Sequence, residues 1–321
     1  MKKISIVTGV YNEEAIVNDV YQEIKRVFKK LGDTYQYEHI FMDNCSTDNT
    51  LPILKRIAAK DKNIKILSYS KNFGPEKSGF TGLIHTRGDA VIPYEGSMKD
   101  PADLIPTFLK YWEEGYQVVY GVRKKIGDNF FMSFLRRCFY RFIRFLSAEE
   151  LPLNVGSFSL IDKKIINELK KINDYKPYVR GLILTAGYKH KSIEYTRGQR
   201  KKGFSKSNLG YLIDFTFNAT ISYSISPIRF CTYTGLTISC LSFVTAITYL
   251  ILHLFFWKAV IPGVAGIIFL ILLFSGLQLF FLGIIGEYIG AIHSQVRQKP
   301  FVIINEKINF STHTKSKNKS I

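Results

Sequence analysis

Cysteine and histidine are scarce in this sequence, and neither is spaced like the ligands of a metal site. The 321 residues include four cysteines without a C-x-x-C pair and six histidines scattered along the chain. Two of the cysteines, Cys231 and Cys240, lie inside a long apolar run. Because zinc sites and disulfide frameworks need closely spaced ligands or paired cysteines, we expect reduced thiols and no histidine metal centre.

Acidic residues are also few. There are 44 Lys+Arg against 26 Asp+Glu, a formal net charge of +18, yet 46% of the residues are hydrophobic and 14% are aromatic. A basic disordered segment that binds nucleic acid would be poor in aromatic residues, and the sequence has no nucleic-acid-binding motif. We therefore expect no nucleic-acid partner. The length allows one large domain or two smaller units with a buried core.

Charged residues are almost absent between Phe230 and Gly286, where Lys258 is the only one. Segments 230–257 and 259–286 each exceed the roughly 20 apolar residues that cross a bilayer, so we predict two transmembrane helices. The alternative, a pair of buried core helices, is disfavoured because such helices seldom have so long an apolar run.

The charges that flank these two segments predict their orientation. The tail 287–321 carries six Lys/Arg, whereas the loop between the predicted spans carries only Lys258. By the positive-inside rule, both the N-terminal portion and the tail face the cytoplasm. The apolar run before Asn12 is too short for a secretory signal, so we predict an integral inner (cytoplasmic) membrane protein with two spans.

The polar portion before the spans alternates between strand and helix patterns. We predict strands at 3–9, 37–43, 64–69, 90–94 and 117–121, and helices at 14–31, 48–60, 76–85 and 101–114. This alternation is typical of an α/β fold with a doubly wound, mostly parallel sheet, in which ligands bind at the carboxyl ends of the strands. No G-x-G-x-x-G motif follows the first strand and no Walker loop is present, which disfavours a dinucleotide cofactor.

Asp43 ends one of the predicted strands. Its carboxylate is either a turn or helix cap, or an acceptor of hydrogen bonds from a nucleobase or ribose. Position alone does not decide between these two interpretations.

Three basic or aromatic segments have compositions typical of segments that bind to a membrane surface. Segment 128–147 predicts a basic amphipathic helix that lies in the headgroup plane, with an ordinary core-packed helix as the alternative. Segment 209–225 predicts an interfacial helix that leads into the first span. The connector 197–206 carries five cations that would bind lipid headgroups or clamp a phosphate, unless they are simple flanking charge.

Short motifs occur in a fixed order along nearly the whole chain. They are V-Y-N-E-E at 10–14, M-D-N-C-S-T-D at 42–48, K-N-F-G at 71–74, Y-G-V-R at 120–123, G-S-F-S-L at 156–160, R-G-L at 180–182, R-x-x-R-x-x-G-F-S-K at 197–206 and S-P-I-R at 226–229. With these motifs the chain resembles the family 2 (GT-A fold) membrane glycosyltransferases that load a sugar onto a polyprenyl phosphate. Dolichyl-phosphate mannose synthases and Gtr-type bactoprenol glucosyltransferases belong to this group.

The resemblance implies a GT-A-like domain at 1–207, a juxtamembrane helix at 208–229, the two spans and a basic tail. It implies a nucleotide-sugar donor across the strand ends, with Glu13 and Asp43 at the base and ribose. The donor-binding residues would be Gly9, Tyr11, Asn12, Glu13, Asp43, Asn44, Lys71, Asn72, Ser97 and Lys99. The catalytic residues would be Asp100, Arg123 and Ser157, and the lipid phosphate would bind Arg197, Arg200, Ser205 and Lys206. The acceptor phosphate would attack the anomeric carbon directly and invert it, and related enzymes suggest a homo-oligomer.

The sequence departs from the family pattern where a metal would bind. The family has D-x-D followed by a Q-D-P-type run, whereas this chain has Glu95, Ser97 and Lys99 at the corresponding positions. Mg²⁺ or Mn²⁺ prefers carboxylate oxygens, so Glu95 alone predicts weak metal binding, and Lys99 would neutralise the diphosphate instead. Asn44 also replaces an Asp, and Ser159 replaces an Arg.

Two hypotheses follow from these departures. The protein is either an active enzyme with weak or no metal dependence, or a catalytically degenerate membrane scaffold. The active hypothesis is favoured because Glu13, Asp43, Asp100, Arg123, Arg200 and Lys206 are all present. A processive polysaccharide synthase fits the sequence less well, since the sequence lacks a Q-x-x-R-W segment and two spans are few for the passage of a polymer through the membrane.

Overall fold

The chain folds as two units in a computed structural model. The first comprises Met1–Ser133, Leu151–Asn208 and Lys299–Ile321, and the second Phe134–Glu150 and Leu209–Gln298. Within these units the structure describes residues 1–98, 100–123, 155–172, 174, 177, 179–185, 187–196, 198, 226–255, 264–297 and 300–310.

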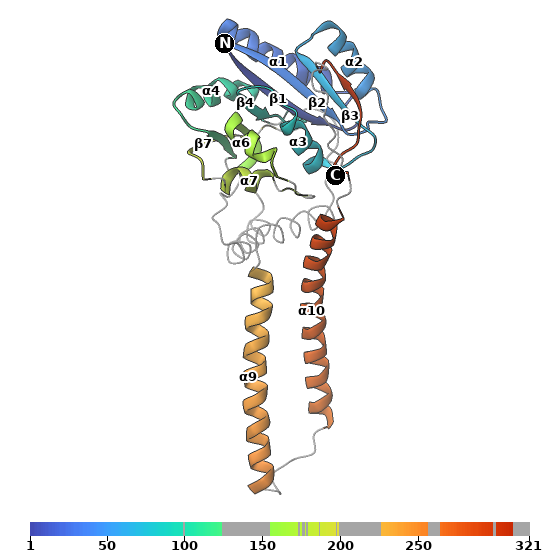
Figure 1. Ribbon diagram of the computed structural model, residues 1–321, viewed down its shortest axis with the longest axis vertical. Coiled ribbons are helices and arrows are strands. Elements are labelled where there is room, and N and C mark those ends of the chain that lie inside the picture. The colour runs from blue at the N-terminus through green and yellow to red at the C-terminus, as the bar shows by residue number, and fades with distance from the viewer. Residues whose placement is uncertain are drawn as a thin grey trace, which may run out of the picture. The chain divides into compact units, whose positions relative to one another are not determined.

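An eight-stranded mixed sheet forms the first unit (Figure 1). Its strands are β1 (Lys2–Val10), β2 (Tyr35–Asp43), β3 (Ile64–Tyr69), β4 (Ala90–Pro93), β5 (Val118–Arg123), β6 (Val155–Asp162), β7 (His190–Tyr195) and β8 (Ile304–Ile308). Their spatial order is β7-β5-β6-β4-β1-β2-β3-β8. Strands β1 to β4 pair in parallel, as do β5 and β7, whereas β6 and β8 run antiparallel to their neighbours.

The helices of this unit follow individual strands along the chain. They are α1 (Val17–Leu31), α2 (Thr50–Lys60), α3 (Pro75–Ile84), α4 (Ile105–Glu113), α6 (Lys163–Leu169) and α7 (Val179–Thr185), with short 3₁₀ helices η1 (Gly32–Thr34) and η2 (Ala102–Leu104). All five predicted strands are present, and β3 has the predicted bounds. The predicted helix 101–114 is divided into η2 and α4.

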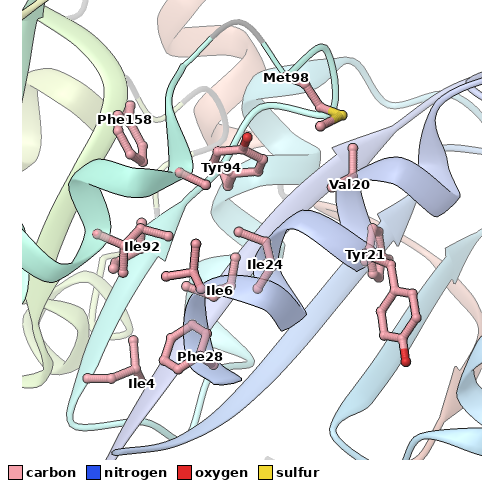
Figure 2. Packing of buried hydrophobic residues seen from close by; sticks show 14 of the residues in the cluster. Ile4, Ile6, Val20, Tyr21, Ile24, Phe28, Ile92, Tyr94, Met98 and Phe158 are labelled. Atoms are coloured by element: carbon pink, nitrogen blue, oxygen red, sulfur yellow. The ribbon is translucent and has the colours of Figure 1, made fainter. Parts of the chain in front are cut away.

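Alternating side chains of the central strands divide the core between the two faces of the sheet. Ile4 and Ile6 of β1 pack with Ile24 and Phe28 of α1 (Figure 2). Val7 of β1 belongs instead to the core on the opposite face, which also contains Met42, Leu67 and Phe80. Because successive residues of a strand face opposite sides, both faces of this sheet are buried, as expected of parallel strands covered by helices.

Two long helices belong to the second unit, α9 (Ser226–Phe255) and α10 (Val264–Val296). Within the described residues, Phe274–Val296 of α10 is the one stretch long and apolar enough, by length and composition, to cross a membrane. α10 continues ten residues past 286, where the sequence analysis placed the end of the second span. Segments 128–147 and 209–225, and the connector apart from Gly198, lie outside the described residues.

A buried ionic cluster lies on β2 and its neighbours. Glu38 is 1% exposed, and its carboxylate accepts hydrogen bonds from Lys65 Nζ at 2.6 Å, Ser5 Oγ at 2.6 Å and the Arg87 backbone N–H at 2.8 Å. Lys3 Nζ lies 3.1 Å from the same carboxylate. Burial opposes ionisation, but these hydrogen bonds, with that of Lys65 the strongest, lower the pKa of Glu38 to about 2.

The neighbouring residue, His39, is fully buried, and its Nε2 lies 2.9 Å from Thr8 Oγ1. Burial lowers the pKa of His39 to about 3, against a small opposing effect of Asp61. The unfolded chain binds a proton here below about pH 6.5 and the folded chain does not, so acid favours unfolding. We expect this histidine to lower the free energy of unfolding by about 2 kcal/mol when the pH falls from 7 to 5.

Urea unfolding of the detergent-solubilised protein at these two pH values measures this cost. His39→Gln should flatten the pH dependence, and His190→Gln, a change of an exposed histidine on β7, should leave it as in the wild type. An unchanged pH dependence in His39→Gln would mean that another group is responsible.

Candidate functional site

Polar loops gather at the carboxyl ends of the four central parallel strands. Residues 11–14 follow β1, 44–49 follow β2, 70–74 follow β3 and 94–100 follow β4. Because β1 pairs with both β2 and β4, the loops after these strands share one edge of the sheet. A Cβ on Gly96 would lie 3.2 Å from the carbonyl oxygen of Gly9, so the loop after β4 passes close to the end of β1.

The loops after β1 and β2 are bound to each other. The Asn12 backbone N–H donates to Ser46 Oγ at 3.0 Å, and Asn12 Oδ1 accepts from the Thr47 N–H at 2.7 Å. The Glu13 N–H donates to Thr50 Oγ1 at 2.8 Å. Asn12 has a φ of 50°, a conformation that asparagine tolerates better than most residues. The two predicted donor-binding residues Asn12 and Glu13 are therefore held against the loop that begins at Asp43.

Asp43 is 1% exposed and presents an acceptor at this edge. Its Oδ1 accepts from the Ser46 N–H at 3.3 Å, while its buried Oδ2 has no hydrogen-bond partner among the described residues. Burial raises the pKa of Asp43, with the hydrogen bonds from Ser46 opposing the rise. A buried acceptor without a partner is costly, so this oxygen is suited to a hydrogen-bond donor of a ligand.

Asn44 connects the loops after β2 and β3. Its Nδ2 donates to Asn72 Oδ1 at 2.8 Å, and its Oδ1 accepts from the Phe73 backbone N–H at 2.9 Å. Lys71 is exposed, and its Nζ lies 5.1 Å from the centre of the Phe73 ring. Asn44, predicted as a ligand contact, thus also fixes the loop that carries Lys71 and Asn72.

A second polar cluster surrounds Glu95, in the loop after β4. Glu95 Oε1 lies 3.4 Å from Arg123 Nη2 and accepts from Ser157 Oγ at 3.4 Å, and Oε2 accepts from Ser97 Oγ at 3.1 Å. The Glu95 and Arg123 side chains are 33% and 29% exposed. Three predicted site residues on separate elements therefore meet at this carboxylate.

Asp100 lies deeper, at 1% exposure, and is reached through Tyr195. The Tyr195 hydroxyl donates to Asp100 Oδ1 and accepts from Arg123 Nε at 3.4 Å. Burial and this bond to Asp100 raise the pKa of Tyr195 to about 12, so it is protonated at neutral pH. Asp100, which the resemblance predicts to be catalytic, accepts this bond with its buried carboxylate, and its charge also favours the positive charge of Arg123. Tyr195 is not among the predicted site residues, and its one signal in the sequence is its place just before the basic connector.

Two glycines make room for this arrangement. A Cβ on Gly121 would lie 2.6 Å from Tyr195 Cε1, and a Cβ on Gly156 would lie 2.6 Å from Arg123 Nη2. Both contacts are closer than real Cβ atoms approach, so each glycine allows a functional side chain to cross its strand. Both glycines lie in the motifs at 120–123 and 156–160, which by themselves assign them no role.

The remaining predicted residues are placed as follows. Gly9 is exposed near the end of β1, and Tyr11 is half-buried in the following loop. Lys99, Arg197, Arg200, Ser205 and Lys206 lie outside the described residues.

The described residues do not form a site for a resident divalent ion. Glu95 already contacts Arg123, Ser97 and Ser157, and the nearby Asp100 carboxylate is buried against Tyr195. No group of three or more His, Cys, Asp or Glu side chains in the described ranges is arranged to hold a metal ion. The described residues therefore offer the weakly bound Mg²⁺ or Mn²⁺ one partly exposed carboxylate, that of Glu95, whereas such an ion takes several oxygen ligands.

Comparisons with known proteins cover nearly the whole chain. The model of glycosyl transferase family 2 matches residues 5–170. The uncharacterized glycosyltransferase YkcC of Bacillus subtilis is 33% identical over 94% of this chain and 93% of its own length. The bactoprenol glucosyl transferase of Shigella phage SfV is 32% identical over 95% of this chain and 99% of its own. Among solved structures, the mannosyltransferase PcManGT from Pyrobaculum calidifontis, in complex with GDP-Man and Mn²⁺, matches 93% of this chain and 88% of its own at 14% identity and a TM-score of 0.44.

Proposed function

The chain belongs to glycosyl transferase family 2, and we propose that it transfers a sugar from a nucleotide-sugar donor to a polyprenyl phosphate at the cytoplasmic face of the membrane. The observation that carries this proposal is the near full-length match to a bactoprenol glucosyl transferase, which includes the long C-terminal helices. The product would serve cell-surface glycan modification.

The loops after β1, β2 and β3 are the proposed site for the donor nucleotide. The Oδ2 atom of Asp43 has no partner among the described residues and would accept a hydrogen bond from the base or ribose. Asn12 and Glu13 contact the segment that follows Asp43. Lys71, in the loop after β3, is exposed, and its positive charge is available to the diphosphate. These features support a nucleoside diphosphate as the ligand.

The second cluster is the proposed place of reaction. A phosphate oxygen of the acceptor would form a bond to the anomeric carbon while the bond from that carbon to the diphosphate breaks on the opposite face. The acceptor is already an anion and needs no strong base, so positioning and charge neutralisation are the main requirements. Arg123 would stabilise the charge that develops on the leaving diphosphate, together with Lys99. Glu95 and Tyr195 contact the Arg123 guanidinium, and Ser157 donates a hydrogen bond to Glu95.

The lipid side of the reaction rests on the basic connector and the apolar helices. We propose that Arg197, Arg200, Ser205 and Lys206 bind the lipid phosphate. We also propose that α9 and α10 are two membrane spans with the first unit and the tail in the cytoplasm, as the distribution of Lys/Arg supports. We propose as well that the protein is a homo-oligomer, which a measurement of its mass in solution tests.

Transfer is tested with purified protein in nanodiscs, undecaprenyl phosphate and a panel of nucleotide sugars, with and without Mn²⁺. We expect a glycolipid product, detected by mass spectrometry, with one of the donors. Asp43→Ala should raise the donor KM by about 10- to 100-fold, because a hydrogen bond to a charged group contributes about 1.5–3 kcal/mol. The exposed Asp33→Ala is the matched control and should behave as the wild type. No product with any donor would favour the degenerate-scaffold hypothesis instead.

A further inference from the structure

The segment after α10 returns to the sheet of the first unit. β8 pairs antiparallel with β3 and forms the edge of the sheet, where Figure 1 draws it in dark red beside β3. In the sequence this segment belongs to the predicted basic tail. Its pairing gives β3 a backbone partner on the side away from β2, so residues 300–310 are part of the folded unit.

Side chains fix this segment on both sides of β3. Asn309 Nδ2 donates to the carbonyl oxygens of Ala58, in α2, and Ile64, in β3, at 2.8 Å each. On the other side, the ring of Phe301 packs edge-on against Phe80 of α3, with 5.4 Å between the ring centres. The segment therefore spans from α2 across β3 to α3.

The pairing extends beyond β3 into the loop that carries Lys71 and Asn72. The register shifts between Ser68 and Tyr69, and the next residue, Ser70, donates its backbone N–H to the Ile303 carbonyl oxygen at 3.0 Å. Asn44 holds the other end of this loop through Asn72 and Phe73. The Ser70–Gly74 loop is thus fixed from the site side by Asn44 and from the sheet edge by Ile303.

We propose that residues 300–310 position the Ser70–Gly74 loop for the nucleoside diphosphate of the donor. This inference rests on the proposed function, because it assigns the tail to the donor half of that site. Without the tail, β3 is an open edge strand and the first residue of the loop loses its backbone partner. Because the segment contacts the Ser70–Gly74 loop directly, we expect its effect on the donor.

Phe301→Ala tests the proposal in the full-length protein. By hydrogen–deuterium exchange, we expect the peptide that contains Ser70 to exchange about tenfold faster, because its amide protection depends on the docked tail. Peptides of α1 should exchange as in the wild type. In the transfer assay the donor KM should rise about five- to tenfold, while kcat and the KM for undecaprenyl phosphate stay within about twofold. Phe301→Leu, which keeps an apolar side chain, should restore both measurements.

Glu306→Gln is the matched control in the same segment. It removes the ion pair between Glu306 and Lys55, whose side chains are 43% and 44% exposed, and should leave exchange and donor KM unchanged. If Phe301→Ala is poorly folded, Asn309→Gly serves as the second variant, with the same expected results. Unchanged exchange at Ser70 in a folded variant overturns the inference. Faster exchange without a change in donor KM also overturns it, whereas a wild type that transfers no sugar counts against the proposed function.

Discussion

Arg123→Gln is expected to lower kcat for sugar transfer by about 100-fold, as is typical when one preorganised group that stabilises developing charge is removed. Its guanidinium is the one described cation that contacts the Glu95 cluster, and Tyr195 and Glu95 hold it from two directions. Burial opposes its charge, but the bond to Tyr195 and the charges of Asp100 and Glu95 raise the pKa of Arg123. It therefore stays charged at every working pH.

The measurement is single-turnover transfer with saturating donor, which reports the chemical step. Gly156→Ala should give a loss of the same kind, because its Cβ would occupy the position of the Arg123 guanidinium. Arg26→Gln, which removes an exposed arginine from α1, is the control. If Arg123→Gln keeps kcat within about threefold of the wild type, Arg123 is not the group that stabilises the leaving diphosphate.

Glu38→Ala is expected to lower the free energy of unfolding by about 3–5 kcal/mol, the usual effect of removing one partner of a buried ion pair. The Lys65 side chain is only 10% exposed and would lose its carboxylate partner. Ser5 Oγ and the Arg87 backbone N–H would lose an acceptor as well. Each buried donor left without an acceptor adds a desolvation cost.

Urea unfolding of the solubilised protein at pH 7 measures this effect. Glu113→Ala is the matched control, since its ion pair with Lys2 joins side chains that are 43% and 52% exposed and should contribute at most about 1 kcal/mol. Equal losses in the two variants would contradict the assignment of Glu38 as a buried structural ion. Because Glu38 and Lys65 lie away from the carboxyl ends of β2 and β3, donor KM should not change in variants that fold.

The central strands could be predicted because their sequences carry a local signal. Runs rich in apolar residues, such as 64–69, are bounded by polar segments, and Asp43 stands where such a run ends. Parallel strands then bring their carboxyl ends together, so Asn12, Asp43 and Asn72 could be grouped before any contact was known.

The features that the sequence did not predict depend on contacts between residues that lie far apart in the chain. Tyr195 and Asp100 are 95 positions apart, and no local pattern near either residue indicates their hydrogen bond. β8 has only two apolar residues among five, and nothing in its own sequence indicates that it pairs with β3, a strand far earlier in the chain. The roles of Gly121 and Gly156 follow from side chains of other strands, which a single motif does not reveal.

The place of β8 in the sheet also imposes an order on synthesis. The ribosome makes β3 early, but its edge partner emerges only after both α9 and α10 have been translated. Until then the nascent chain exposes an unpaired strand edge, a surface prone to aggregation or to binding by chaperones. The first unit therefore completes its sheet only after the apolar helices have been translated, which links maturation of the proposed donor site to the final stage of translation.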